Sequence, residues 1–423
     1  MSLIQNRRSI ENKKTHDALE CLEAGLEAAR PEAFLAKFVK NNELVAPKNI
    51  LLSKYERIYI ISVGKAADVM GKFVHAKINS DGGIIVIPQT HAPVSLGKKF
   101  KVIRAPHPIP NSKSIVAAKS IIKLLKNTKK DDFVIFLVSG GTSPLVCLPN
   151  GITLKEKQKL TKNLHKCGAS IKEINALRKH LSLVKGGRLL ENLNCQAISY
   201  VMSDVVGNDL SSVASGLTYC DKTTFMDCLK IIKKYHLESQ LPKSVLLHLK
   251  LGVRGKIPET PKTPKIQNIL IGSNKDCISA VVKKAKSLGY NTKTLSPLSG
   301  DVKSAATKIL QNFPNKPKSC LIFGGETTVR VKGNGKGGRN QELVLQILKK
   351  SKLDVVIASI GTDGIDGNTK HAGAISSATS QKTEIDRYLN NNDSNSFFKK
   401  YGGLVMTGPT HTNLLDIGLI LRS

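Results

Sequence analysis

The hydrophobic pattern alternates between two kinds of segment along most of the chain. Short apolar runs such as RIYIISV (57–63) and DFVIFLVS (132–139) are typical of buried strands. Longer segments with apolar residues at helical spacing follow them, for example GKAADVMGKFVHAKI (64–78) and SKSIVAAKSIIKLLK (112–126). Strands that alternate with helices of this length predict an α/β protein whose sheets are covered on both faces.

The alternation breaks in the Pro- and Lys-rich segment LGVRGKIPETPKTPKIQ (251–267). A second series of strand-like and helix-like runs follows it, from NILIGS (268–273) to SCLIFGG (319–325). Single hydrophobic cores usually stop growing before about 300 residues, so a chain of 423 residues is expected to hold two domains. We predict an N-terminal domain over residues 1–250 and a C-terminal domain over residues 265–423.

The formal net charge of +33 raises the question of a nucleic-acid partner. The lysines, however, are spread in ones and twos along helix-like segments. Trp is absent and aromatic residues make up only 4% of the chain, which leaves few surfaces on which bases could stack. An anionic substrate would also be attracted by this charge, so charge alone does not decide, but the composition favours solvated lysine faces over nucleic-acid binding.

The sequence shows neither a signal peptide or membrane span nor a cysteine pattern typical of zinc binding. The N-terminal MSLIQNRRSIENKKTH lacks the apolar core of a signal peptide, and the run FVIFLVSGGTSPLVCL is too short and interrupted to span a membrane. The eight cysteines show neither CxxC pairs nor the Cys/His spacing of a zinc site. We therefore expect a cytoplasmic protein with reduced thiols and no membrane association.

Candidate binding residues in the N-terminal half follow predicted strands, because ligands of open α/β sheets bind beyond the carboxyl ends of the strands. Lys65 follows the strand 57–63 at a helix start, where backbone N–H groups favour an anion. The turn after the next apolar strand offers glycines and hydroxyls to a phosphate or a small substrate, although a purely structural turn is the alternative. It comprises Ser139, Gly140, Gly141, Thr142 and Ser143. No Walker A sequence GxxxxGK[ST] occurs in the chain.

Two further candidates lie in the same half. The basic segment INALRKHLSLVKGGRL (174–189) contains Arg178 and Lys185, which suit a carboxylate or phosphate clamp, although a solvated basic helix would look similar. Asp204 ends the strand-like AISYVMS (197–203) and suits either Mg²⁺ binding or acceptance of a substrate proton. Asp209 follows in the same motif, and capping of a helix start is the alternative to a functional role for this residue.

In the C-terminal half, GNGKGG (333–338) formally matches the dinucleotide fingerprint GxGxxG between a strand and a helix. The cations beside its glycines favour a transferable phosphate instead. The candidates here are Glu326, Gly335, Lys336, Gly337, Gly338, Arg339 and Asn340. A later loop, GTDGIDG (361–367), carries Asp363 and Asp366, which suit Mg²⁺ directly or through its waters, with an Asx-turn loop as the alternative.

Taken in order, these motifs resemble a known family. VGKAA, PHPIPNSKS, LVSGGTSPL, INALRKHLSLVKGGRL, SDVVGNDLSSVASGLT, GGETTVRVKGNGKGGRNQEL, GTDGIDGNTKHAGA and TGPTHTNLLDIGLIL are similar to those of the glycerate 2-kinases of the MOFRL type, from about residue 55 to the end. The resemblance implies an N-terminal Rossmann-like α/β/α sandwich and a C-terminal α/β MOFRL domain with a mixed sheet. It also implies an active site in the interdomain cleft.

The activity that the resemblance implies is phosphorylation of D-glycerate on its 2-hydroxyl by ATP with Mg²⁺, giving 2-phosphoglycerate and ADP (EC 2.7.1.165). The lysine of VGKAA and the arginine of GGRN, Lys65 and Arg339, are then expected to serve phosphoryl transfer, with Asp204 assisting proton loss. The metal candidates are Asp204, Asp363 and Asp366. The chain departs from the family at Asn208, where an acidic residue is usual, and at His411, where a small residue is frequent.

Two other classes stay open at this stage. A hydroxypyruvate reductase that uses NAD(P)H is the first, because GNGKGG mimics a dinucleotide fingerprint. A basic nucleic-acid-binding protein is the second. The sequence does not fix the oligomeric state, and a homodimer is one of the assemblies that stay open.

Overall fold

The computed structural model describes residues 2–45, 49–314, 316–351, 353–377 and 384–422. The chain divides into two compact units. Unit 1 consists of Met1–Ala33 and Gly272–Ser423, and unit 2 of Phe34–Ile271. Among the described residues, no helix combines the length and apolar character needed to cross a bilayer.

The N-terminal helix α2 (His16–Ala28) packs in unit 1, whereas the sequence prediction put it in the N-terminal domain. A Cβ on Gly25 of this helix would lie 2.6 Å from Ile417 Cδ1 and 2.8 Å from Val281 Cγ2, so the glycine lets the helix approach these side chains closely. Helical periodicity identifies an apolar face but not the core against which it packs. The predicted N-terminal domain of residues 1–250 therefore differs from unit 2 at both ends.

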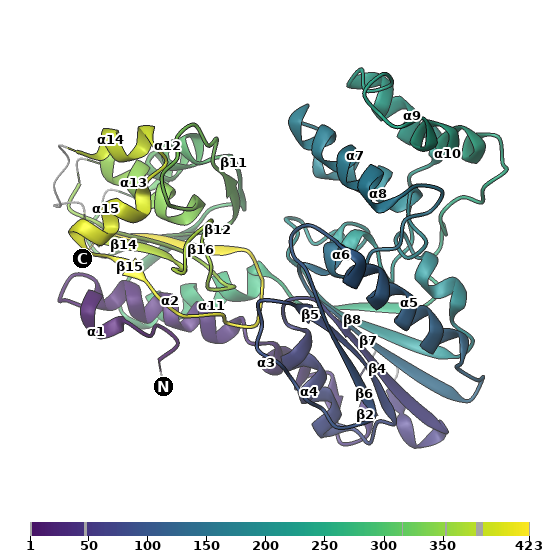
Figure 1. Cartoon of the computed structure of the whole chain (residues 1–423). Helices are drawn as coiled ribbons and strands as arrows, with labels where there is room; N and C mark the ends of the chain where they lie inside the picture. The colour runs from purple at the N-terminus through teal and green to yellow at the C-terminus, as the bar shows by residue number, and fades with distance from the viewer. Residues whose placement is uncertain (1, 46–48, 315, 352, 378–383, 423) are drawn as a thin grey trace. The chain divides into compact units, whose positions relative to one another are not determined.

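Unit 2 is built on a six-stranded sheet with the order β6-β5-β4-β7-β8-β9 (Figure 1). Its strands are β4 (Arg57–Val63), β5 (Gly82–Pro88), β6 (Phe100–Ala105), β7 (Asp132–Val138), β8 (Gln196–Met202) and β9 (Gln267–Gly272). The pairs from β6 to β8 are parallel. Counted from β4, this is the 3-2-1-4-5-6 order of doubly wound dinucleotide-binding folds. The prediction of a Rossmann-like sandwich is confirmed.

Helices cover both faces of this sheet, as the apolar runs require. Along β5, Ile84 and Val86 join a core with α5 (Ser112–Lys126), while Ile85 points to the opposite face. There, Gly71 of α4 (Ala67–Lys77) lies so close that an added Cβ would be 2.7 Å from Ile85 Cδ1. Alternate residues of this strand thus pack against helices on opposite faces of the sheet.

The rest of unit 2 comprises short elements and a helical subdomain. The short elements are α3 (Pro31–Leu35), which begins in unit 1 and ends in unit 2, β1 (Val39–Lys40), β2 (Glu43–Leu44), β3 (Ile50–Leu51), α6 (Thr142–Leu145) and the 3₁₀ turns Leu52–Lys54, Arg188–Asn192 and Val213–Ser215. The subdomain has its own apolar core and consists of α7 (Leu154–Lys166), α8 (Ile171–His180), α9 (Phe225–Lys234) and α10 (Lys243–Val253). Figure 1 shows these four helices grouped apart from the strands of the sheet.

Unit 1 contains a seven-stranded mixed sheet with the order β10-β12-β16-β13-β14-β15, and β11 also pairs with β12. Its strands are β10 (Asn291–Thr294), β11 (Leu298–Asp301), β12 (Ser319–Thr328), β13 (Val356–Gly361), β14 (Gly373–Ser377), β15 (Leu404–Val405) and β16 (Asp416–Arg422). β10 and β11 run parallel to β12, whereas β16 is antiparallel to both of its neighbours. The prediction of a mixed sheet in the C-terminal domain is confirmed.

Helices cover the two faces of this second sheet. One face carries α2 and α11 (Asn274–Ser287). The other shares a core with α12 (Val302–Asn312), α13 (Arg339–Lys350) and α15 (Ser394–Tyr401). The shorter helices α1 (Arg7–Ile10) and α14 (Ile385–Asn390) complete the unit.

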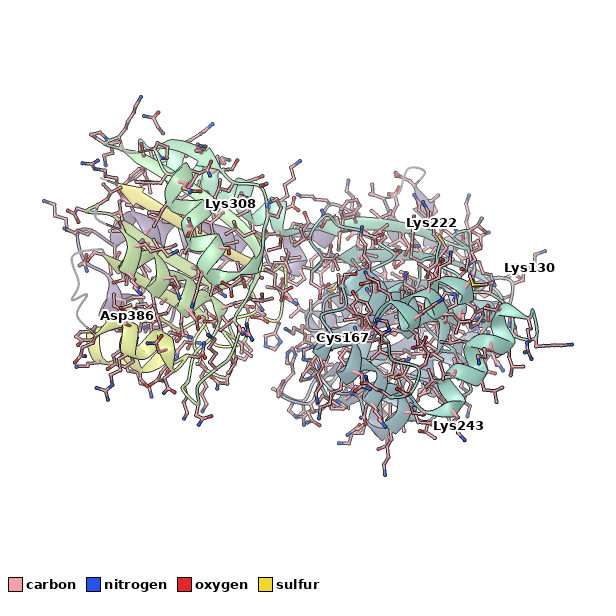
Figure 2. All side chains as sticks on the ribbon, turned by 90° about the horizontal axis from the view of Figure 1, so that it is seen from above. Lys130, Cys167, Lys222, Lys243, Lys308 and Asp386 are labelled. Carbon is pink, nitrogen blue, oxygen red and sulfur yellow. The ribbon has the colours of Figure 1, made fainter. Side chains whose placement is uncertain are left out.

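Exposed lysines occur on both units. Figure 2 shows Lys130, Lys222 and Lys243 extending outward from different parts of unit 2, and Lys308 doing so from unit 1. All four are exposed. The eight cysteines are free thiols, and six of them are buried.

Candidate functional site

The strand order of unit 2 creates a switch point between β4 and β7, the position at which open α/β sheets bind ligands. Lys65 lies just beyond the end of β4, and Ser139 directly follows β7. The backbone N–H of Lys65 donates to the carbonyl of Gly140 across this point, with an N–O distance of 2.9 Å. Two of the predicted segments are therefore joined at the position where ligand binding is expected.

Asp204 lies at the same end of the sheet, beyond the neighbouring strand β8. Its Oδ2 accepts a hydrogen bond from the N–H of Gly141 over 3.3 Å. Lys65 Cγ is 3.2 Å from the position that a Cβ on Gly141 would occupy. Burial raises the pKa of Asp204, and the nearby Lys65 ammonium partly opposes that rise. The structure thus gathers a cation, a backbone turn and a carboxylate.

The hydroxyls of the turn divide into structural and pocket-lining groups. Ser139 Oγ accepts from the N–H of Ala66, and Thr142 Oγ1 donates to the carbonyls of Val63 and Ser139. Both side chains are buried, so they hold the turn together rather than face a ligand. Ser143 differs because it lines a pocket of about 770 Å³.

This pocket, which we call the cation pocket, lies between the turn and helices α7 and α8. Its cationic lining consists of Lys155, Lys157, Lys159, Lys162, Arg178 and Lys185, and His165, whose pKa is lowered by burial, lies among them. The other lining residues are Pro108, Ile109, Pro110, Ser143, Pro144, Cys147, Gln158, Thr161 and Ser215. No Asp or Glu is among the described residues that line it, so the pocket suits an anionic ligand.

Capping boxes fix the helices that carry the deepest cations. Thr153 Oγ1 accepts from the N–H of Glu156 and the Glu156 carboxylate accepts from the N–H of Thr153, which starts α7. The same arrangement of Ser170 and Glu173 starts α8. The two helices thereby present Lys157 and Arg178, respectively, to the pocket.

Lys157 and Lys185 are almost completely buried in the pocket wall. Lys185 Nζ donates to the carbonyl of Ala214 over 3.0 Å, and no carboxylate lies beside it in the pocket lining. Burial lowers its pKa to about 7, and the neighbouring Lys157 and Arg178 contribute to the decrease. Lys157 was not predicted, although its spacing with Leu160 and Leu164 puts it on the apolar face of α7, which is a readable signal.

Other cations of the basic segment serve the structure. Lys179 pairs with Asp221 over 3.2 Å, and His180 Nε2 lies 3.0 Å from Glu259 Oε2. Arg188 donates to the carbonyl of Pro258. The segment therefore splits into residues that line the cation pocket and residues that hold the connection to β9. The Asp209 carboxylate accepts from Ser211 and Ser212, as in a local turn cap.

In unit 1, Arg339 lies at the centre of a cluster of acidic residues. Its Nε and Nη2 donate to the two carboxylate oxygens of Asp416 over 2.6 and 2.9 Å, and its Nη1 lies 2.9 Å from Glu326 Oε1. The antiparallel register brings Asp416, at the start of β16, opposite the ends of β12 and β13. Burial alone would lower the pKa of Arg339, but Asp416 and Glu326 raise it overall. Asp416 was not predicted, although it lies in a segment that supported the family resemblance.

The glycine-rich loop before Arg339 is not a dinucleotide turn. Three of its backbone N–H groups have partners within unit 1: Gly335 donates to the carbonyl of Asn391, Lys336 to Asp393 Oδ1 and Gly337 to Asn368 Oδ1. A Cβ on Gly335 would lie 2.4 Å from Asp393 Cβ, so the glycine is needed for packing. These partners argue against backbone contacts from Gly335, Lys336 and Gly337 to a nucleotide, and the fingerprint for a reductase finds no support here.

Asp366 also has a different role from the predicted one. Its buried carboxylate accepts hydrogen bonds from the backbone and side-chain amides of Asn340 and Gln341, with N–O distances of 2.9–3.3 Å. These are the first residues of α13 after Arg339, so Asp366 satisfies N–H groups that the helix itself leaves unpaired. Burial raises its pKa to about 6. The carboxylate fixes the helix start and is poorly placed to bind a metal ion.

Gly338→Ala is expected to destabilise unit 1. The new Cβ would lie 2.3 Å from both Cγ and Oδ1 of Asp366, which the amides of α13 hold in place. We expect a loss of about 1–3 kcal/mol in the free energy of unfolding, measured as a lower urea midpoint. Asn334→Ala in the exposed part of the same loop is the control and should change the midpoint little. Equal midpoints for the two variants would contradict this account of Asp366.

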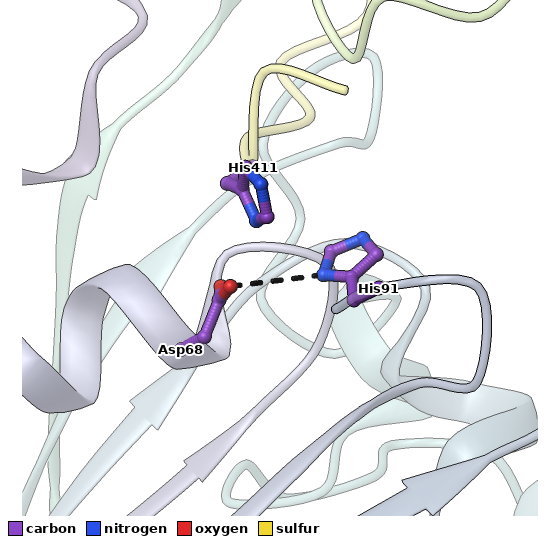
Figure 3. Close-up of side chains that lie close together, drawn as sticks. All are labelled: Asp68, His91 and His411. Carbon is purple, nitrogen blue, oxygen red and sulfur yellow. Dashed lines mark ion pairs between the residues drawn. The ribbon is translucent and has the colours of Figure 1, made fainter. Parts of the chain in front are cut away.

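A second carboxylate lies near the switch point of unit 2. Asp68, in the first turn of α4, is 3.9 Å from His91 Nδ1, and Figure 3 shows the two side chains facing each other. Both side chains are at least 90% buried. The contact brings the segment after β5 beside the first turn of α4, the helix that follows Lys65, and it is an ion pair when His91 is protonated.

Comparisons with known proteins match both parts of the chain. Residues 17–250 match a family model described as a domain of unknown function, DUF4147, and residues 319–416 match that of the MOFRL family. A protein named glycerate 2-kinase from Pyrococcus horikoshii is 39% identical over 381 residues, or 85% of this chain and 86% of the relative. One named D-glycerate 2-kinase from Thermotoga maritima is 36% identical over 428 residues, or 96% and 98%.

Solved structures agree with these matches. The crystal structure of glycerate kinase (EC 2.7.1.31) from Thermotoga maritima has a TM-score of 0.81 at 35% identity, covering 97% of this chain and 99% of the other. A structure of a protein from Pyrococcus horikoshii has a TM-score of 0.79, also at 35% identity, with coverages of 98% and 100%. The similarity thus extends over both units.

Proposed function

The chain belongs to the family of glycerate 2-kinases with a MOFRL domain, and from this premise we propose that it phosphorylates the 2-hydroxyl of D-glycerate with ATP. The products are 2-phosphoglycerate and ADP. The observation that carries the proposal is similarity to a D-glycerate 2-kinase over 96% of this chain and 98% of that protein. The relatives carry kinase names, and none of them supports the reductase alternative.

D-Glycerate is a small anion, and the cation pocket suits its carboxylate. We assign the carboxylate to Arg178 and Lys185, and a hydroxyl to Ser143, whose Oγ lies 2.7 Å from Ser215 Oγ. The pocket lies close to Lys65 and Asp204, because Ser143 is two residues beyond Gly141, which contacts both. A substrate anchored in the pocket can therefore place its 2-hydroxyl near the carboxylate of Asp204.

The chemical step forms a bond between the 2-oxygen and the γ-phosphorus and breaks the bond from that phosphorus to the bridging oxygen of ADP. Asp204 accepts the hydroxyl proton, and its raised pKa makes it a better base than an ordinary aspartate. Lys65 stabilises the negative charge on the phosphoryl oxygens, and Arg339 is assigned the same kind of role. Catalysis is then mostly positioning and charge neutralisation.

Three carboxylates were predicted as Mg²⁺ ligands, and they do not fit equally. Asp363 Oδ1 accepts the N–H of Ile365, and Asp204 Oδ2 accepts the N–H of Gly141. Both carboxylates stay proposed Mg²⁺ ligands, because carboxylate oxygens are the ligands that this ion prefers in proteins. Asp366 has four amide donors around it and fits poorly. Bound Mg²⁺ would neutralise charge on the nucleotide phosphates. For Asp204, metal binding and proton acceptance are alternatives, because coordination to the cation lowers the basicity of a carboxylate.

Of the nucleotide contacts predicted for the glycine-rich loop, we keep only those of the Lys336 and Arg339 side chains. Lys336 is exposed, and Arg339 is partly exposed beside Glu326. Gly335, Gly337, Gly338 and Asn340 pack within unit 1. Within unit 1, we therefore propose Lys336 and Arg339 as the side chains that contact phosphate.

The alkaline limb of the pH profile should report on Lys185. Since its pKa is lowered to about 7, the lysine is protonated below that pH and neutral above it, whereas the substrate carboxylate stays ionised. We expect kcat/KM for D-glycerate to fall above pH 7, approaching tenfold per pH unit. Lys185→Arg, which keeps its charge at all these pH values, should move this limb to higher pH. An unchanged limb in the variant would remove Lys185 from substrate binding.

The activity itself is tested by ADP release. Purified protein is mixed with ATP, Mg²⁺ and D-glycerate, and ADP is measured with pyruvate kinase and lactate dehydrogenase. Release that depends on D-glycerate supports the kinase. Absence of release, together with oxidation of NADH by hydroxypyruvate, would contradict it.

A further inference from the structure

The cation pocket contains one deep cation that neither the family motifs nor the proposed mechanism uses. Lys157 of α7 is 8% exposed, and two of its three N–H donors point to carbonyls at the end of α8. They reach the carbonyls of Arg178 and Leu181 over 3.4 and 3.3 Å, at the long end of hydrogen-bond distances. The third donor remains for a ligand.

No Asp or Glu among the described residues of the pocket lining neutralises this charge. The Arg178 guanidinium opposes the protonated form of Lys157, and Cys147 would favour that form only as a thiolate. Burial lowers the pKa of Lys157, as expected for an ammonium group without a carboxylate partner. A buried cation of this kind is unfavourable in the empty protein and becomes favourable when an anion binds.

Arg178 and Lys185 line the same cavity. The three cations come from α7, from the last turn of α8 and from the segment that follows α8. A carboxylate has two oxygens with about four acceptor positions, so it can accept hydrogen bonds from all three groups. A neutral polyol or an aldehyde offers no charge to such a cluster.

We propose that Lys157 is a specificity-determining residue that binds the substrate carboxylate together with Arg178 and Lys185. That the bound anion is D-glycerate rests on the proposed function. That the bound ligand is an anion rests on the pocket alone. It separates the two substrates: the carboxylate lies in the cation pocket, and the nucleotide lies elsewhere. The expected signature is a change in the KM for D-glycerate without a change in the KM for ATP.

The test compares Lys157→Met, which keeps the side-chain length without the charge, with Lys157→Arg. Lys166→Met is the matched control, since Lys166 is exposed on the same helix and does not line the pocket. We expect Lys157→Met to raise the KM for D-glycerate by about 10- to 100-fold, the usual effect of losing a charged hydrogen bond. The KM for ATP should stay constant, and Lys157→Arg should restore part of the affinity.

Calorimetric titration with D-glycerate, without ATP, provides a second readout. The wild type and Lys166→Met should bind, and Lys157→Met should lose binding by the same factor. If the wild type binds D-glycerate but shows no turnover, the proposed function fails while the carboxylate site stands. Unchanged affinity in Lys157→Met, or an increase in the KM for ATP instead, would overturn the inference. Loss of folding is checked by thermal unfolding, where a midpoint no lower than that of the wild type is expected, because Lys157→Met removes an unfavourable buried charge and leaves no carboxylate unpaired.

Discussion

Lys65→Met is expected to lower kcat for D-glycerate phosphorylation by about 10³-fold, with little change in thermal stability. The side chain lies beside Gly141 at the switch point, where it can donate to phosphoryl oxygens. Removal of one preorganised donor to a transition-state oxygen costs about 10²–10³-fold, and a cation on a transferring phosphoryl group contributes at least as much. Methionine keeps the aliphatic part of the side chain, so packing against the turn should persist.

Steady-state kinetics and thermal unfolding of the same preparations check this prediction. Lys72→Met is the matched control, because Lys72 is exposed on the helix that follows Lys65. The control should retain full turnover. If Lys65→Met also retained it, Lys65 would have no part in the reaction. If only the KM for D-glycerate rose, Lys65 would belong to substrate binding instead.

Arg339→Lys is expected to lower kcat by about 10²-fold. Arginine donates simultaneously to both oxygens of Asp416 and to Glu326, and the fixed fork of its guanidinium makes this possible. Lysine keeps the charge but offers donors from a single atom, so the cation is no longer held in one orientation. Arg330→Lys, at an exposed position in the same unit, is the control and should leave kcat unchanged.

Alanine would be a less informative replacement for Arg339. It would leave the buried Asp416 carboxylate without its cation, and breaking a buried pair in this way costs about 3–5 kcal/mol. Loss of activity in Arg339→Ala would then mix catalysis with stability. Full activity in Arg339→Lys would show that a positive charge at this position suffices for catalysis. The two hydrogen bonds from Arg339 to Asp416 would then have no role in the reaction.

The sequence predicted the architecture well because the signal is local. The period of the apolar residues identified the strands and helices, and helix-length connections between strands imply parallel pairing. The sheet that places Lys65 and Ser139 together follows from such features. The position of α2 did not, because an apolar helix face fits either core, and its contact with Ile417 joins residues far apart in the chain.

Site residues were predicted less evenly, and the reasons are physical. The motif GNGKGG suggested a phosphate-binding turn, but its glycines are required by packing against Asp393 and its neighbours, which no short pattern reveals. Asp366 was predicted as a metal ligand, but four amide N–H donors from Asn340 and Gln341 at the start of α13 surround its carboxylate. Lys157 was missed because a lysine on an apolar helix face was taken as part of a solvated basic helix. A search for charged residues at buried helical positions would have found it.

The central claim, phosphorylation at the 2-hydroxyl of D-glycerate, is tested most directly by coupling the reaction to enolase without phosphoglycerate mutase. Enolase converts 2-phosphoglycerate to phosphoenolpyruvate, whose absorbance is followed. The account predicts phosphoenolpyruvate in step with ADP release. ADP release without phosphoenolpyruvate, with enolase shown to be active on added 2-phosphoglycerate, would contradict the assignment and move the phosphate to another position.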